Sequence, residues 1–65
     1  MAANRNHERP AEDRRREIFR ALVEAQDEGA GVARSRTLVA DRFGLSQEQV
    51  RDIEREGLQA EWPPL

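Results

Sequence analysis

The sequence predicts an all-α fold in which three helices share one core. Apolar residues recur at helical spacing in three separate segments, and glycine-containing stretches divide these segments from one another. With 65 residues and no cysteine, the chain can form only one small domain that no disulfide stabilises. We expect a disordered arm over residues 1–10, the helical domain over 11–60, and a Trp-Pro-Pro tail over 61–65.

The first predicted helix lies in "AEDRRREIFRALVEAQDEG", which begins at Ala11. Acidic residues in its first turn favour the positive end of the helix dipole, and Gly29 is placed to end it. Its inward stripe consists of Ile18, Phe19, Leu22, Val23 and Ala25.

The second predicted helix follows a loop at 29–31 and lies in "ARSRTLVADRF". Ser35 is a candidate N-cap, and Gly44 stands just past the end of the segment. The expected inward residues are Leu38, Val39 and Phe43.

The third predicted helix begins at about Gln47. Ser46 and Gln49 have the spacing of a capping box, and Gly57 is expected to end or bend the helix. Leu58 is expected to point inward. The whole predicted core is Ile18, Phe19, Leu22, Val23, Leu38, Val39, Phe43, Leu45, Val50 and Ile53.

The second and third segments together satisfy the steric demands of a helix-turn-helix. Ala40 is small enough for a helix crossing, Gly44 tolerates a positive φ in the turn, and Leu45 can plug the turn. Val50 and Ile53 then anchor the last helix from beneath. An ordinary helical hairpin with a glycine turn remains the alternative.

Residues 39–58, "VADRFGLSQEQVRDIEREGL", resemble the helix-turn-helix of region 4 of bacterial sigma factors, and the resemblance covers about residues 36–58. The residues that match the family pattern are Val39, Arg42, Phe43, Gly44, Glu48, Arg51, Ile53, Glu54 and Leu58. The resemblance implies the fold and two activities, which are reading a promoter element and docking on RNA polymerase.

The resemblance also implies that base edges are read from Gln47, Glu48, Arg51 and Asp52. Arg55, Arg36 and Arg42 complete the predicted DNA-binding set. Phosphate contacts are expected from Arg34, Arg36 and Arg42 and from the run Arg14, Arg15 and Arg16. Gln47 replaces a usual arginine and Asp52 a usual glutamine. Four carboxylates and two arginines between residues 47 and 58 give this helix a negative charge, so we expect modest affinity for DNA.

The tail contains the only aromatic residue outside the helices. Trp62 is expected to fold back onto Phe19 or Val23 and so complete a thin core. The alternative is a partner-binding tail formed by Trp62, Pro63, Pro64 and Leu65, since an aromatic beside two prolines suits groove binding.

The sequence is therefore compatible with two classes of function. The first is a sigma-region-4-like DNA-binding protein acting in transcription. The second is a protein-interaction module that uses the acidic third helix and the tail, with RNA polymerase or another assembly as partner. A homodimer is left open. The sequence shows no catalytic set, no metal-ligand spacing and no cofactor motif. It has neither a signal peptide nor a membrane span, so we expect a cytoplasmic protein without a membrane partner.

Overall fold

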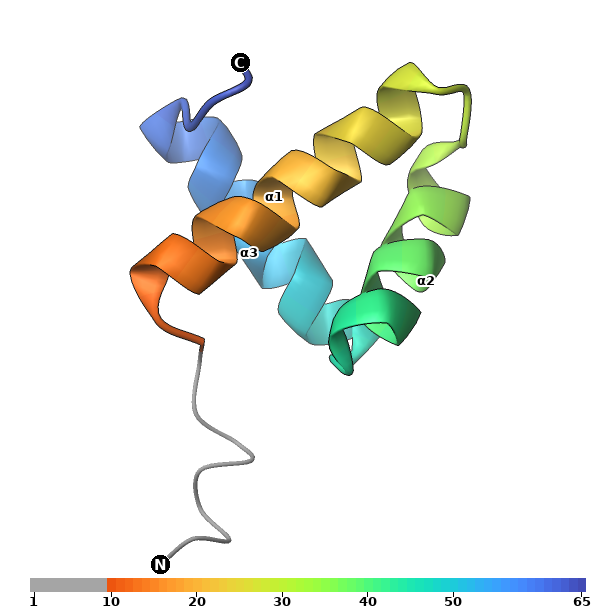
Figure 1. The fold of residues 1–65 in the computed structure, drawn as a ribbon, viewed down its shortest axis with the longest axis horizontal. Coiled ribbons are helices and arrows are strands. Elements are labelled where there is room, and N and C mark those ends of the chain that lie inside the picture. Colours follow the sequence, from red (N-terminus) through yellow and green to blue (C-terminus); the bar gives the residue numbers. More distant parts are fainter. Residues whose placement is uncertain (1–9) are drawn as a thin grey trace, which may run out of the picture.

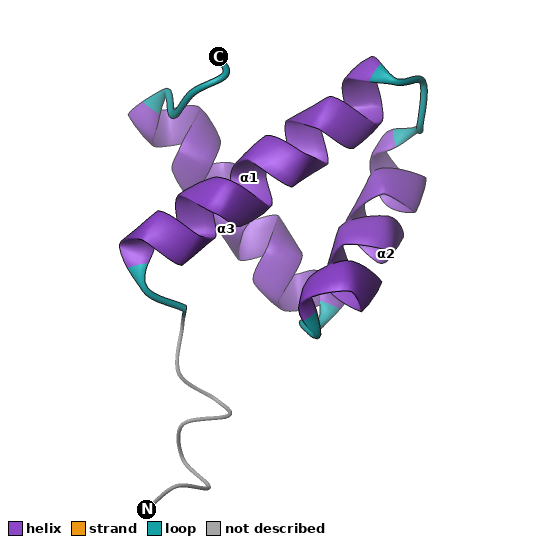
Figure 2. Cartoon of the chain, in the orientation of Figure 1, coloured by secondary structure: helices purple, strands orange, loops and turns teal. Residues whose placement is uncertain are grey.

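The computed structural model describes residues 10–65, and three helices make up most of this range. Helix α1 spans Glu12–Asp27, α2 spans Val32–Phe43 and α3 spans Gln47–Ala60. Every helix contacts the other two: α1 crosses over α3, and α2 returns from the end of α1 (Figure 1). Short loops join the helices, and residues 10–65 contain no strand (Figure 2). The all-α prediction is confirmed, whereas the predicted arm, apart from Pro10, lies outside the described residues.

The prediction that Ser35 caps α2 is wrong. The N-cap is Gly31, and the helix begins at Val32, one turn earlier than Ser35 would require. Ser35 is instead fully buried between α1 and α2. Its hydroxyl donates to the carbonyl of Val32 at 2.8 Å and accepts from the side-chain amide of Gln26 at 3.1 Å. Because both bonds satisfy the hydroxyl, a serine can occupy this dry position.

Gly44 ends α2 in the left-handed conformation that the sequence predicts, with φ 68° and ψ 38°. The amide of Leu45 then donates to the carbonyl of Ala40 at 2.9 Å, which closes the end of the helix. Ala40 itself is buried, as a small residue at a helix crossing should be. The turn from α2 into α3 therefore takes only three residues, 44–46.

The predicted capping box at the start of α3 is confirmed. The Ser46 hydroxyl accepts from the amide of Gln49 at 3.0 Å, and the Gln49 side chain accepts from the amide of Ser46 at 2.9 Å. The expectation that Gly57 ends the helix is wrong, because α3 continues to Ala60. Gly57 is buried against Phe19, so its lack of a side chain serves packing and does not interrupt the helix.

The core forms where the three helices meet. Val23, Phe43 and Leu45 are only partly buried but pack against it. Its buried apolar members are Ile18, Phe19, Ala21, Leu22, Val39, Ala40, Val50, Ile53 and Trp62.

Two leucines assigned to the inside by the sequence lie outside the core. Leu38 is 45% exposed and Leu58 is 55% exposed. On α2 the buried positions are Ser35, Val39 and Ala40, which leaves Leu38 at the edge of the stripe. On α3, Gly57 faces inward, and the helical period therefore turns Leu58 outward.

The tail folds back onto the domain, as the sequence predicts. Trp62 is 5% exposed, and its ring meets that of Phe19 edge to face at a centroid distance of 6.0 Å. The Trp62 amide donates to the carbonyl of Gly57 at 3.0 Å, and the guanidinium of Arg16 lies over the indole. Over residues 10–65, none of the helices has the length and apolar character that crossing a membrane requires.

Candidate nucleic-acid interface

The outer face of α3 carries five of the seven side chains that the sequence assigns to DNA binding. They lie on this face because Val50, Ile53 and Gly57 turn inward at helical spacing and the capping box fixes where the helix begins. All five are exposed: Gln47, Glu48, Arg51, Asp52 and Arg55.

The flanks of α3 are tied to the other two helices by ion pairs. Glu56 accepts two hydrogen bonds from the Arg15 guanidinium of α1, at 2.8 and 2.9 Å, and Arg15 also donates to the carbonyl of Pro10 at 2.7 Å. On the other flank, Arg36 of α2 donates to Glu54, with its nearest nitrogen 2.8 Å from the carboxylate. These carboxylates therefore hold the three helices together.

The environment of Arg15 fixes its charge. Its hydrogen bond to the Glu56 carboxylate, together with that group's negative charge, raises the pKa of Arg15 above its ordinary value and outweighs the opposing effect of burial. Both side chains are partly buried, so water screens the pair less than it screens a surface pair. Arg15 is thus a permanent cation at the α1–α3 contact.

These pairs change the electrostatics expected for α3. The sequence gives residues 47–58 four carboxylates and two arginines. In the fold, Arg15 and Arg36 neutralise Glu56 and Glu54, so four arginines match the four carboxylates. The charges on and around α3 therefore balance, and the net repulsion of DNA phosphates that the sequence of this helix leads one to expect is absent.

Arginines gather beside the outer face of α3. Arg36, Arg51 and Arg55 line one shallow hollow of about 260 Å³ together with Glu54 and Leu58. Because Glu54 is the only carboxylate among these five residues, the hollow carries an excess of positive charge. Three of the seven predicted DNA-binding residues therefore meet at one place, although α2 supplies one and α3 the other two.

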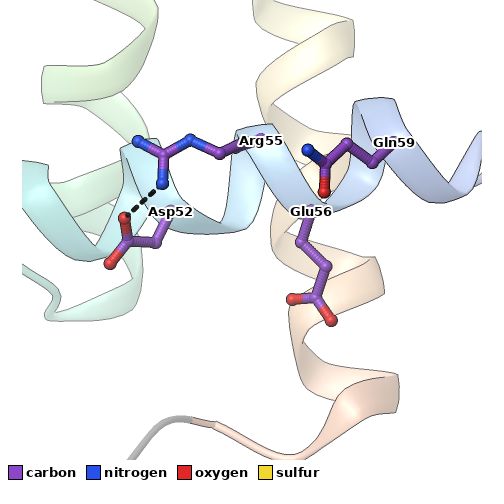
Figure 3. A pocket seen from close by; sticks show the side chains of 4 residues that line it. All are labelled: Asp52, Arg55, Glu56 and Gln59. Atoms are coloured by element: carbon purple, nitrogen blue, oxygen red, sulfur yellow. Dashed lines mark ion pairs between the residues drawn. The ribbon is translucent and has the colours of Figure 1, made fainter.

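Asp52 lies on the opposite side of Arg55, in a second hollow that Glu56 and Gln59 also line (Figure 3). One carboxylate oxygen of Asp52 is 3.6 Å from the Arg55 guanidinium, and both side chains are more than half exposed. Glu56 extends away from this pair toward α1, in agreement with its bonds to Arg15 (Figure 3). The Asp52–Arg55 pair is open enough to exchange partners with a ligand.

Gln47 is anchored at the start of the outer face. Its side-chain amide donates to the hydroxyl of Thr37 on α2 at 3.2 Å. This contact leaves the Gln47 carbonyl oxygen to accept from a ligand and restricts how the side chain can turn. Gln47 is thus held across the turn between α2 and α3.

Arg42, which the sequence groups with this set, lies elsewhere. Its guanidinium sits 5.2 Å from the centre of the Phe43 ring, and that of Arg14 from α1 sits 4.8 Å from the same centre. Arg42 also borders a hollow formed by α1 and α2, where Ala21 and Glu24 are neighbours. The structure therefore groups Arg42 with side chains of α1.

The four predicted partner-binding residues of the tail are separated by burial. Trp62 belongs to the core, whereas Pro63, Pro64 and Leu65 are exposed. Pro63 borders a hollow that four side chains of α1 complete: Asp13, Arg16, Glu17 and Arg20. Any contact made by these four residues must therefore use Pro63, Pro64 and Leu65.

Three structural partners of the site are not among the predicted residues: Thr37, Glu54 and Glu56. The two carboxylates are visible in the sequence, but helix packing decides that Glu54 faces Arg36 and that Glu56 faces Arg15. Comparisons with protein families, with curated proteins and with solved structures find no match to this chain.

Proposed function

We propose that this chain is a helix-turn-helix protein, similar to region 4 of sigma factors, that binds duplex DNA through the outer face of α3 and acts in transcription. In this proposal α2 and α3 are the two helices of the motif and Gly44 provides its turn. The outer face of α3 enters the major groove, which is wide enough to admit one helix.

The arginine hollow beside α3 is the observation that carries the proposal. Arg51 lies on the outer face, and Arg36 and Arg55 border the same hollow. In the major groove, Arg51 can donate to guanine or to a phosphate, Gln47 can pair with adenine, and Glu48 can accept from cytosine. The hollow thus supplies phosphate contacts beside the side chains that can read bases.

The same electrostatics limit the affinity. The outer face itself carries Glu48 and Asp52 against Arg51 and Arg55, so its charges balance. Affinity for DNA rises with the number of phosphates that cations neutralise, and few are available here. We therefore expect weak binding by a single domain and a shallow dependence on salt concentration.

Arg51→Ala tests the role of the helix. Loss of the proposed contact between the Arg51 guanidinium and DNA should weaken binding to the preferred duplex by about 1–3 kcal/mol and relax the sequence preference at one base pair. Asp52→Asn should strengthen binding to any duplex, because it removes a negative charge near phosphates. Fluorescence anisotropy with duplexes selected from a random pool measures both effects.

Arg20→Ala is the matched control, since Arg20 is an exposed arginine of α1 that pairs with Glu24 of the same helix. It should change binding far less than Arg51→Ala. Glu56 is unsuitable for testing the effect of negative charge on DNA binding, because its substitution also breaks the ion pair with Arg15 between α1 and α3. If the substitutions at Arg51 and Asp52 both leave binding unchanged, α3 is not a DNA-reading helix.

The alternative proposal, a module that binds a protein through α3 and the tail, has less support. Trp62 packs on Phe19, and Glu54 and Glu56 pair with arginines of their own chain. The tail therefore offers only its last three residues, and the acidic character expected of α3 is neutralised. A pull-down from native lysate that persists after nuclease treatment would favour this alternative.

A further inference from the structure

A groove lies between α1 and α2, away from the residues assigned above to the outer face of α3. Its floor is apolar, with Ala21 and Ala25 from α1 and Val39 from α2. Leu38 stands at its centre and is 45% exposed. Together with this floor, Leu38 forms an apolar patch between charged walls, and a patch of this kind is a candidate surface for another protein.

Leu38 separates two hollows of the groove. The one next to the α1–α2 loop has a volume of about 310 Å³ and is bordered by Ala30 and Arg34. The other has a volume of about 200 Å³ and is bordered by Glu24 and Arg42. The groove thus presents one projecting leucine between two shallow hollows.

The two walls of the groove carry opposite charges. The wall formed by α1 has Glu24 and Glu28, and the wall formed by α2 has Arg34 and Arg42. Near the loop, Glu28 and Arg34 border the same hollow, yet within residues 10–65 neither forms an ion pair or side-chain hydrogen bond. At the other end Glu24 pairs only with the exposed Arg20 of its own helix, at 3.2 Å.

This charge arrangement is self-complementary. A two-fold axis that runs along the groove places the acidic wall of one copy opposite the basic wall of the other, at the same level. Glu28 then faces Arg34 of the second copy, Glu24 faces Arg42, and the two Leu38 side chains meet at the centre. An isologous interface requires such a match between a surface and itself.

We propose that the groove between α1 and α2 is the interface of a homodimer, with Leu38 as its apolar centre and the Glu28–Arg34 pairs at its edge. The groove is small compared with the roughly 800 Å² per partner of a standard stable interface, so the dimer is weak. Self-association should therefore develop at about 10–1000 µM. The interface does not depend on the proposed DNA binding.

Sedimentation equilibrium on the full chain, at low ionic strength, tests the proposal. The wild-type mass should rise toward twice the single-chain mass as concentration increases. Glu28→Arg and Arg34→Glu should each weaken self-association about tenfold or more, because symmetry makes each reversal act twice. An equimolar mixture of the two variants should dimerise again, since one then carries arginine at both positions 28 and 34 and the other carries glutamate at both.

Leu38→Gln should also abolish the rise in mass, whereas Leu58→Gln, on a more exposed leucine outside the groove, should leave it unchanged. Both charge variants alter exposed side chains, and circular dichroism verifies that they fold. A wild-type chain that keeps the single-chain mass up to about 1 mM overturns the proposal. So does a dimer that the two charge reversals fail to weaken, or a mixture of them that fails to reassociate.

Discussion

Gly57→Ala replaces one of the worst helix-forming residues with the best, yet we expect it to destabilise the protein. Gly57 is a buried position within α3, and a Cβ placed there would lie within 2.6 Å of three ring atoms of Phe19. Phe19 is fully buried between Gly57 and the rest of the core, where its ring also meets Trp62. The ring therefore has no solvent-exposed direction in which to move.

The expected magnitude is the difference between two effects. Overpacking a core by one methyl group costs about 1–3 kcal/mol, and a clash with a confined ring belongs at the upper end of that range. Alanine recovers about 1 kcal/mol of helix propensity. The net loss should be about 1–2 kcal/mol, which lowers the melting temperature of so small a domain by roughly 5–15 °C.

Thermal and urea unfolding, followed by circular dichroism, measure the effect. Gln59→Ala and Gln59→Gly give the propensity difference at an exposed site of the same helix, where alanine should be the more stable variant. A double-mutant cycle with Phe19→Leu isolates the clash, since the smaller side chain should remove most of the penalty at residue 57. If Gly57→Ala stabilises the wild-type domain, the close approach to Phe19 does not exist.

Two further predictions concern the tail and the turn. Deleting residues 61–65 should lower the free energy of unfolding by about 3–5 kcal/mol, the usual cost of losing a buried aromatic side chain. Deleting only residues 63–65 should cost little, because Trp62 is kept. A red-shifted fluorescence emission of Trp62 in the intact chain, which indicates a hydrated ring, would contradict this. Gly44→Val should cost about 1–2 kcal/mol in urea unfolding, and Gly44→Asn less. Because no atom lies within 4 Å of a Cβ at Gly44, that cost comes from its φ of 68° alone, and equal stability of the three proteins would remove the turn assignment.

Local chemistry explains why several features could be predicted from the sequence. Gly44 and the capping box of Ser46 and Gln49 act within a few residues along the chain. Their backbone requirements do not depend on how the helices pack. Trp62 could be placed for a different reason, because a chain of 65 residues has few apolar groups with which to close its core.

Features that depend on the rotation of one helix against another could not be predicted in the same way. Leu38 and Leu58 each adjoin a residue that the core uses, and a rotation of about 100° per residue decides which of the two neighbours is buried. Ser35 looked like a cap because its type favours that position, but Gln26 and the Val32 carbonyl satisfy its hydroxyl inside the domain. Gly57 looked like a helix breaker because propensity alone ignores Phe19.

The net charge around α3 depends on helix packing more than any other feature does. This charge decides how much of the DNA-binding energy can come from phosphates and how much from base edges. With Glu54 and Glu56 held by arginines of the other helices, the outer face neither attracts nor repels phosphates strongly. Hydrogen bonds to base edges would then supply a larger share of the binding energy than in a strongly basic domain, so discrimination between sequences should exceed what the modest affinity suggests. The proposed dimer groove uses none of these α3 residues. Of the seven predicted DNA-binding residues, the one that borders it is Arg42 of α2, which lies beside Ala21 and Glu24 of α1. A second copy can therefore occupy the groove while the outer face of α3 remains open.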